Sequence, residues 1–148
     1  MDTGMATPTS TPEPEPVIRR SDDIEYETVS AADGLEKGVL ISDDHGAPNF
    51  AIRRFVLEAG ASVPAHTNEV EHEQYVLEGE YTVGIGNMQA ADSATGDAVD
   101  SGEEYMVEAG DSLLIPAGTV HWYRNESDEP GAFLCAVPNG DDEIDLLE

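Results

Sequence analysis

The sequence is poor in cysteine and in basic residues. Cys135 is the single cysteine among 148 residues, and its place in the apolar run AFLCAVP predicts a buried, unreactive thiol with no disulfide inside the chain. Lys37 is the single lysine, and the six basic residues face 32 aspartates and glutamates. The net charge of −26 excludes nucleic acids and anionic membranes as expected partners, because both would be repelled.

Long apolar runs are also absent. No stretch approaches the length of a membrane span, and the first residues lack the basic and apolar regions of a secretory signal, so we expect a cytoplasmic protein. The acids are spread along the whole chain and repel one another unless salt screens them. This composition predicts a halophilic protein with a haloarchaeal-like surface. An acidic protein from an ordinary cell is the alternative.

The sequence also lacks a long stretch with the hydrophobic period of a helix, and it contains short strand patterns instead. Residues 1–18 are rich in Thr, Pro and acids and predict a disordered tail. Residues 19–138 contain eight or nine short apolar or alternating segments separated by Gly and Pro turns. Residues 139–148 form an acidic C-terminal tail. The pattern therefore predicts one all-β domain, a sandwich or a barrel.

Two of the four histidines fall in the segment 66–80, HTNEVEHEQYVLEGE. Alternation along a strand puts His72, Gln74 and Val76 on one face, and the turn at 78–80 predicts that a hairpin begins here. An imidazole on an apolar face needs a hydrogen-bond partner or a metal, and its nitrogens suit Zn, Cu, Fe or Ni. The segment therefore predicts a metal site, with its glutamates on a solvated surface.

The segment 110–125, GDSLLIPAGTVHWYRN, carries another histidine. Its spacing resembles the second motif of the cupins at every position: Gly110, Pro116, Gly118, His121 and Asn125. The segment 60–79 resembles the first cupin motif, with Gly60, His66 and Gly79 at its spacing and His72 where many members have Glu. Asn68 stands where the family usually has a second histidine, and NEVEHE stands where small four-histidine cupins have HPWEHE. The resemblance covers roughly residues 49–138.

The resemblance implies a small single-domain cupin of the conserved-barrel type. Its fold would be a double-stranded β-helix, or jelly-roll barrel, that holds one divalent metal ion between the two motifs, with Fe, Mn, Zn, Ni and Cu all compatible. The ligands implied are His66, His72 and His121, with Asn68 or Gln74 as a loose extra ligand. The missing histidine also leaves open a barrel that has lost its metal and binds a small molecule.

Tyr123 and Gln74 are the candidate catalytic residues. Alternation puts Tyr123 on the face of His121, and Trp122 and Arg124 on the opposite face, so Tyr123 is the better pocket candidate among the aromatic residues. Either Tyr123 or Gln74 would guide a proton beside a metal that polarises a carbonyl group.

Three functions remain open, each with a small-molecule substrate or ligand. The resemblance favours an enzyme and, first, a metal-dependent oxygenase acting on a small enolisable or aromatic compound. A metal-dependent isomerase or lyase acting on a sugar or keto acid is the alternative, followed by a non-catalytic binding module. A homodimer is a further expectation, because an open sandwich must hide its edge strands.

Overall fold

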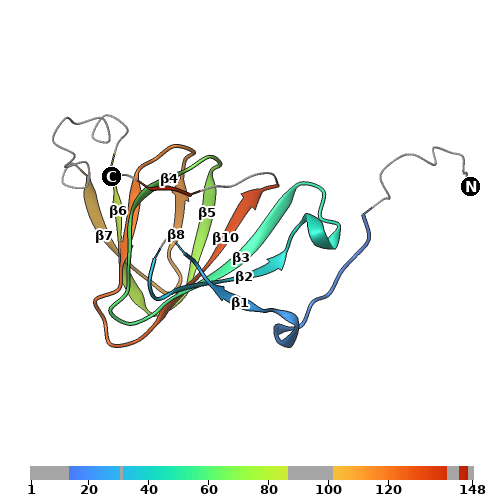
Figure 1. Ribbon diagram of the computed structural model, residues 1–148, viewed down its shortest axis with the longest axis horizontal. Coiled ribbons are helices and arrows are strands. Elements are labelled where there is room, and N and C mark those ends of the chain that lie inside the picture. Colours follow the sequence, from blue (N-terminus) through green and yellow to red (C-terminus); the bar gives the residue numbers. More distant parts are fainter. Residues whose placement is uncertain (1–13, 31, 87–101, 140–143, 147–148) are drawn as a thin grey trace, which may run out of the picture.

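The computed structural model describes residues 14–30, 32–86, 102–139 and 144–146. These ranges form two antiparallel sheets packed against each other, with the N-terminal segment extending to one side (Figure 1). Their helical elements are two short 3-10 turns, η2 (Ser21–Asp23) and η3 (Asp43–His45). No helix in these ranges has the length and apolar character that crossing a membrane would need. The prediction of an all-β jelly-roll barrel is confirmed.

The larger sheet has six strands in the order β1-β2-β3-β10-β5-β8. Their bounds are β1 Tyr26–Thr28, β2 Leu35–Ile41, β3 Phe50–Leu57, β5 His72–Glu78, β8 Ser112–Ile115 and β10 Gly131–Pro138. The smaller sheet has five strands in the order β11-β4-β9-β6-β7. Their bounds are β4 Ser62–Asn68, β6 Glu80–Ile85, β7 Glu103–Glu108, β9 His121–Arg124 and β11 Ile144–Leu146. Consecutive strands from β3 to β6 alternate between the sheets, so both sheets contribute to one interior.

The turn at Gly79 joins the two sheets and does not close a hairpin. We expected β5 to pair with the strand that follows it, but β5 pairs with β8 and β10, whereas β6 pairs with β7 and β9. That prediction was wrong. Because β5 and β6 lie in opposite sheets, the apolar face of each strand points into the same core between the sheets. Gly79 makes the crossing possible, because its φ is 75° and a Cβ atom at this position would overlap the Pro130 carbonyl oxygen.

The structure describes both terminal segments only in part. Residues 1–13 of the predicted N-terminal tail lie outside the described part, as do residues 87–101 between β6 and β7. In the C-terminal segment, residues 144–146 form β11, which pairs antiparallel with β4. The sequence did not indicate this strand, because its pattern is short and surrounded by acids.

Four aromatic side chains form the centre of the core between the sheets. The Phe55 and Phe133 rings are stacked with centroids 5.2 Å apart, and Tyr123 stacks on Phe133 at 5.5 Å. Tyr81 contacts both Tyr123 and Phe133. Since the Tyr123 ring also lies 5.7 Å from His121, this aromatic core borders the histidines directly.

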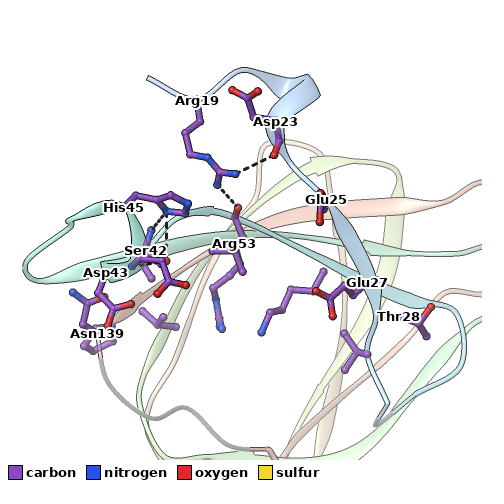
Figure 2. Close-up of a pocket in the computed structure, with 17 residues that line it drawn as sticks. Arg19, Asp23, Glu25, Glu27, Thr28, Ser42, Asp43, His45, Arg53 and Asn139 are labelled. Atoms are coloured by element: carbon purple, nitrogen blue, oxygen red, sulfur yellow. Dashed lines mark hydrogen bonds between the residues drawn. The ribbon is translucent and has the colours of Figure 1, made fainter. Parts of the chain in front are cut away.

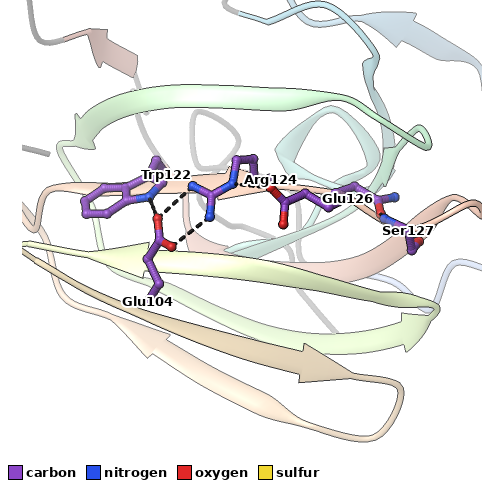
Figure 3. A network of polar contacts seen from close by, with 6 residues as sticks. Glu104, Trp122, Arg124, Glu126 and Ser127 are labelled. Carbon is purple, nitrogen blue, oxygen red and sulfur yellow. Dashed lines mark hydrogen bonds and ion pairs between the residues drawn. The ribbon is translucent and has the colours of Figure 1, made fainter. Parts of the chain in front are cut away.

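Trp122 and Arg124 lie on the opposite face of β9, as alternation predicted, and both bind Glu104 of β7 (Figure 3). Arg124 donates two hydrogen bonds of 2.7 Å to the carboxylate, and the Trp122 indole donates one of 2.9 Å. The two Arg124 contacts are the main reason that the pKa of Glu104 falls from 4.5 to about 2. The carboxylate therefore stays charged at pH values well below the ordinary pKa of a glutamate.

This network predicts a pH-dependent loss of stability in Glu104→Gln. The folded pKa lies below the unfolded one, so the charge stabilises the fold above pH 4.5 and this contribution disappears as pH falls toward 2. Because the Glu104 side chain is 41% exposed, we expect a loss of only about 1 kcal/mol at neutral pH. Urea unfolding from pH 7 down to acid measures it. Glu126→Gln is the control and should have a smaller effect, because the Glu126 side chain is 68% exposed. A loss of stability in Glu104→Gln that stays constant from pH 7 down to acid would contradict the lowered pKa of Glu104.

Candidate metal centre

Three histidines from three strands meet inside the barrel. His66 lies in β4, and its register partner on β9 is His121. His72 begins β5 in the facing sheet. The ring centroids of His66 and His121 are 4.2 Å apart, and those of His72 and His121 are 6.4 Å apart. The structure therefore brings together the three histidines that the two sequence motifs contribute.

Backbone carbonyl groups orient two of these rings. The ladder between β4 and β9 shifts its register between Val63 and His66, and there the Pro64 carbonyl lies 2.8 Å from His66 Nδ1. The Thr119 carbonyl lies at the same distance from His121 Nδ1. A carbonyl only accepts hydrogen bonds, so each Nδ1 carries the proton, and the neutral ring keeps its lone pair on Nε2. This is the arrangement that histidine ligands of metals adopt.

His72 is oriented by a sulfur atom. Its Nδ1 lies 3.2 Å from Sγ of Cys135, which is fully buried as the sequence predicted. Arg53 Nη2 lies 3.5 Å from the same sulfur. A thiol both donates and accepts, so this contact orients the His72 ring without dictating its tautomer.

Asn68, Gln74 and Tyr123 line the same cavity as the histidines. Gln74 Nε2 donates a 2.8 Å hydrogen bond to the Tyr123 hydroxyl, and Gln74 Oε1 is buried with no hydrogen-bond partner among the described residues. Burial raises the pKa of Tyr123 above its ordinary value, so the phenol stays protonated. Because its oxygen already accepts from Gln74, its own proton is available to an acceptor in the cavity.

The cavity has a volume of about 70 Å³, and its charged lining residues are Lys37 and Arg53. Alternation of β3 turns Arg53 inward with Phe55, whose ring centroid lies 5.4 Å from the guanidinium carbon. Its neighbour Arg54 faces the other way and pairs with Glu78 outside, at 3.2 Å. Sequence reasoning did not assign Arg53 or Lys37 to the site. The inward alternation of Arg53 among apolar residues was the available signal.

The chemical type of these side chains is suitable for binding a divalent metal ion. Neutral imidazoles are ligands for Fe, Mn, Ni, Cu and Zn, and two of the three here carry their lone pair on Nε2. As placed, however, no three His, Cys, Asp or Glu side chains within the described ranges form a group that could hold a metal ion. The ligand roles of His66, His72, His121 and Asn68 therefore stay predictions.

A family model described as a cupin domain matches residues 53–137. The chain belongs to the cupins. This match covers both histidine segments and strands from both sheets, so the resemblance found in the two motifs is confirmed over the barrel. A search among curated proteins found no match for this cupin.

Solved cupin structures share this fold. The polyketide cyclase RemF from Streptomyces resistomycificus is 25% identical, with a TM-score of 0.69 over 89% of this chain and 87% of that one. Rru_A2000 from Rhodospirillum rubrum, a cupin-2 domain, is 20% identical with a TM-score of 0.67 over 90% and 82%. Oxalate decarboxylase from Lactobacillus farciminis, in complex with formate, is 22% identical with a TM-score of 0.65 over 85% of this chain but 34% of its own.

Proposed function

We propose that this cupin is a metal-dependent enzyme that acts on a small enolisable carbonyl compound. The observation that carries the proposal is the Tyr123 hydroxyl, which accepts a hydrogen bond from Gln74 in the same cavity as three imidazoles. His66, His72 and His121 would hold the metal. A divalent ion bound there would supply Lewis-acid polarisation of a substrate oxygen.

The chain's own contribution would be proton handling. Tyr123 donates its hydroxyl proton to a substrate oxygen, and the Gln74 amide keeps the phenol oxygen in one position. The aromatic core around Tyr123 excludes water and fixes the ring. This arrangement supports non-redox chemistry such as isomerisation, cyclisation or bond cleavage next to a carbonyl group. The likeness to a polyketide cyclase supports the same class.

An oxygenase, which the sequence placed first, is the second candidate. The specific observation in its favour is a donor set of neutral imidazoles, which suits Fe(II) and leaves positions for substrate and oxygen. An enolisable carbonyl compound is a suitable substrate for both the non-redox reaction and the oxygenase reaction. The proton-bearing Tyr123 is the reason that we now place the non-redox reaction first.

Tyr123→Phe is expected to lower kcat about 100-fold while KM changes only a few-fold, because the proton donor is lost and the ring remains. The assay loads the protein in turn with Fe, Mn, Co, Ni and Zn and offers a panel of 1,3-diketones and oxo acids. Turnover is followed under air and under argon, together with oxygen uptake. Tyr105→Phe is the control, because the Tyr105 side chain is exposed and bonded to Glu103.

The two atmospheres separate the candidates. Turnover under argon supports the non-redox enzyme, whereas oxygen uptake that requires substrate and Fe supports the oxygenase. Absence of turnover with every metal and substrate class would contradict both and favour a binding module. The halophilic, cytoplasmic and homodimeric character of the protein stay predictions from its sequence.

A further inference from the structure

An open pocket beside the N-terminal segment uses polar side chains to hold the fold together. It has a volume of about 690 Å³ and lies between this segment, the η3 turn and the adjoining ends of β2, β3 and β10 (Figure 2). Arg19 donates 2.8 Å hydrogen bonds there to the carbonyl groups of Val39 and Leu40. His45 Nδ1 accepts a hydrogen bond from the Ser42 amide. These hydrogen-bonding groups are thus engaged with the chain itself.

The histidine cavity, by contrast, contains a buried hydrogen-bond acceptor that the fold does not use. Gln74 lies on the inward face of β5 with His72 and Val76, and it is 3% exposed. Its Nε2 donates to the Tyr123 hydroxyl at 2.8 Å, which fixes the carboxamide in one orientation. Its Oε1 is buried and accepts no hydrogen bond from any described residue. A buried acceptor without a donor is costly, so a donor group that reaches Oε1 would be held firmly.

The Tyr123 hydroxyl is a donor next to this acceptor. Its oxygen accepts from Gln74, so its own proton is directed to a different acceptor. Tyr123 is buried, and its ring stacks on Phe133 at 5.5 Å and lies 5.7 Å from His121, which limits movement of the hydroxyl. Because one hydrogen bond joins the two side chains, the donor of Tyr123 and the acceptor of Gln74 lie side by side.

A donor beside an acceptor matches a molecule that carries the opposite pair. A carbonyl oxygen accepts from Tyr123, and a hydroxyl group on the neighbouring carbon donates to Gln74 Oε1. A simple ketone or a diketone carries acceptors only, so it leaves Oε1 without a donor. The cavity volume of about 70 Å³ has room for roughly five or six water-sized groups. This is the size of a hydroxy ketone of three or four carbons.

We propose that the substrate is a small hydroxy ketone and that Gln74 selects it through the hydroxyl group. The inference rests on the proposed function, because it names the substrate class of the same site. Gln74 then has two roles: its Nε2 positions the proton donor, and its Oε1 recognises the hydroxyl group next to the reacting carbonyl group. A hydroxy ketone is enolisable at the carbon that carries its hydroxyl group, as the proposed chemistry requires. Recognition by Gln74 needs neither turnover nor a bound metal.

Titrations of the full chain with acetoin, butanone and butanedione, followed by NMR spectroscopy, test the proposal. The three compounds share a four-carbon chain with a carbonyl group, and only acetoin carries a hydroxyl donor. Binding is measured after chelation and again with Zn²⁺. We expect acetoin to bind about 10-fold or more tightly than butanone and butanedione in both states. A preference that appears only with Zn²⁺ would assign the hydroxyl group to the metal and overturn the role of Gln74.

Three variants locate the preference. Gln74→Met keeps the length of the side chain and removes the acceptor, so acetoin should bind no more tightly than butanone. Tyr123→Phe removes the donor to the carbonyl group that all three compounds carry, so it should weaken all three and keep the preference for acetoin. Glu73→Met is the matched control and should bind all three as the natural chain does, because Glu73 is the exposed neighbour of Gln74 on the other face of β5.

Melting curves of each variant detect loss of fold, and where Gln74→Met does not fold, the comparison of the three compounds on the natural chain decides alone. Absence of acetoin binding, equal binding of acetoin and butanone, or a preference for acetoin that persists in folded Gln74→Met overturns this inference. A preference for acetoin without turnover of any compound by any metal form overturns the proposed function alone. Turnover of ketones or oxo acids without a preference for acetoin overturns this inference alone.

Discussion

His121→Ala is expected to weaken the binding of divalent metal by about 100-fold or more. The estimate follows from the free energy of metal binding shared among a few ligands. His121 lies between the other two rings, 4.2 Å from His66 and 6.4 Å from His72 between centroids, so its loss removes the central donor. Titration of the chelated protein with Fe, Mn, Co, Ni and Zn measures the change.

His45→Ala is the matched control for this experiment. His45 lies in η3, where its Nδ1 accepts a hydrogen bond from the Ser42 amide, so it is the one histidine outside the cluster. Metal affinity in His45→Ala should equal that of the natural chain. Equal affinity in His121→Ala, with a melting curve that shows an intact fold, would remove the metal from the proposed function.

Gly84→Ala is expected to destabilise the fold by about 3 kcal/mol, the upper part of the usual range for overpacking. Gly84 of β6 is the register partner of Trp122 on β9, and a Cβ atom at this position would overlap the indole ring. The indole is held by its hydrogen bond to Glu104, so it cannot simply turn away. Urea unfolding of the variant measures the loss.

Gly86→Ala provides the control within the same segment. A Cβ atom there would lie 3.5 Å from Val120, which is ordinary van der Waals contact. We expect a change below about 0.5 kcal/mol. A second test combines Gly84→Ala with Trp122→Val. If the overlap is the cause, the glycine substitution should cost much less in that background, and an undiminished cost would show that the indole is not responsible.

Local patterns in the sequence were sufficient for the class of fold and for the faces of two strands. Period-two alternation placed Gln74 with His72 and Tyr123 with His121, and both pairs line the cavity. The reason is that a strand buried on one face alternates apolar and polar residues, and this alternation shows which residues share a face. That His121 meets the other histidines came from the family resemblance, since spacing carries no information on contacts some fifty residues apart.

Long-range pairing accounts for most of what the sequence did not reveal. The turn at Gly79 looks like a hairpin, because nothing in its neighbourhood distinguishes pairing with the next strand from crossing to the other sheet. The assignment of Arg53 to the site needed the contact from β3 to Cys135 on β10. Both depend on strands that are distant in the chain, and pairing between distant strands overrides local propensity.

β11 has a practical consequence for anyone handling this protein. It covers the outer edge of β4, pairing Leu146 with His66 and Ile144 with Asn68. A truncated chain that ends before residue 144 would leave the backbone of β4 open to strands of other molecules, and such uncovered edges promote aggregation. An affinity tag fused to the C-terminus would follow shortly after β11, the strand that pairs with His66 and Asn68 of β4, two residues of the cavity. The N-terminus is therefore the better place for a tag.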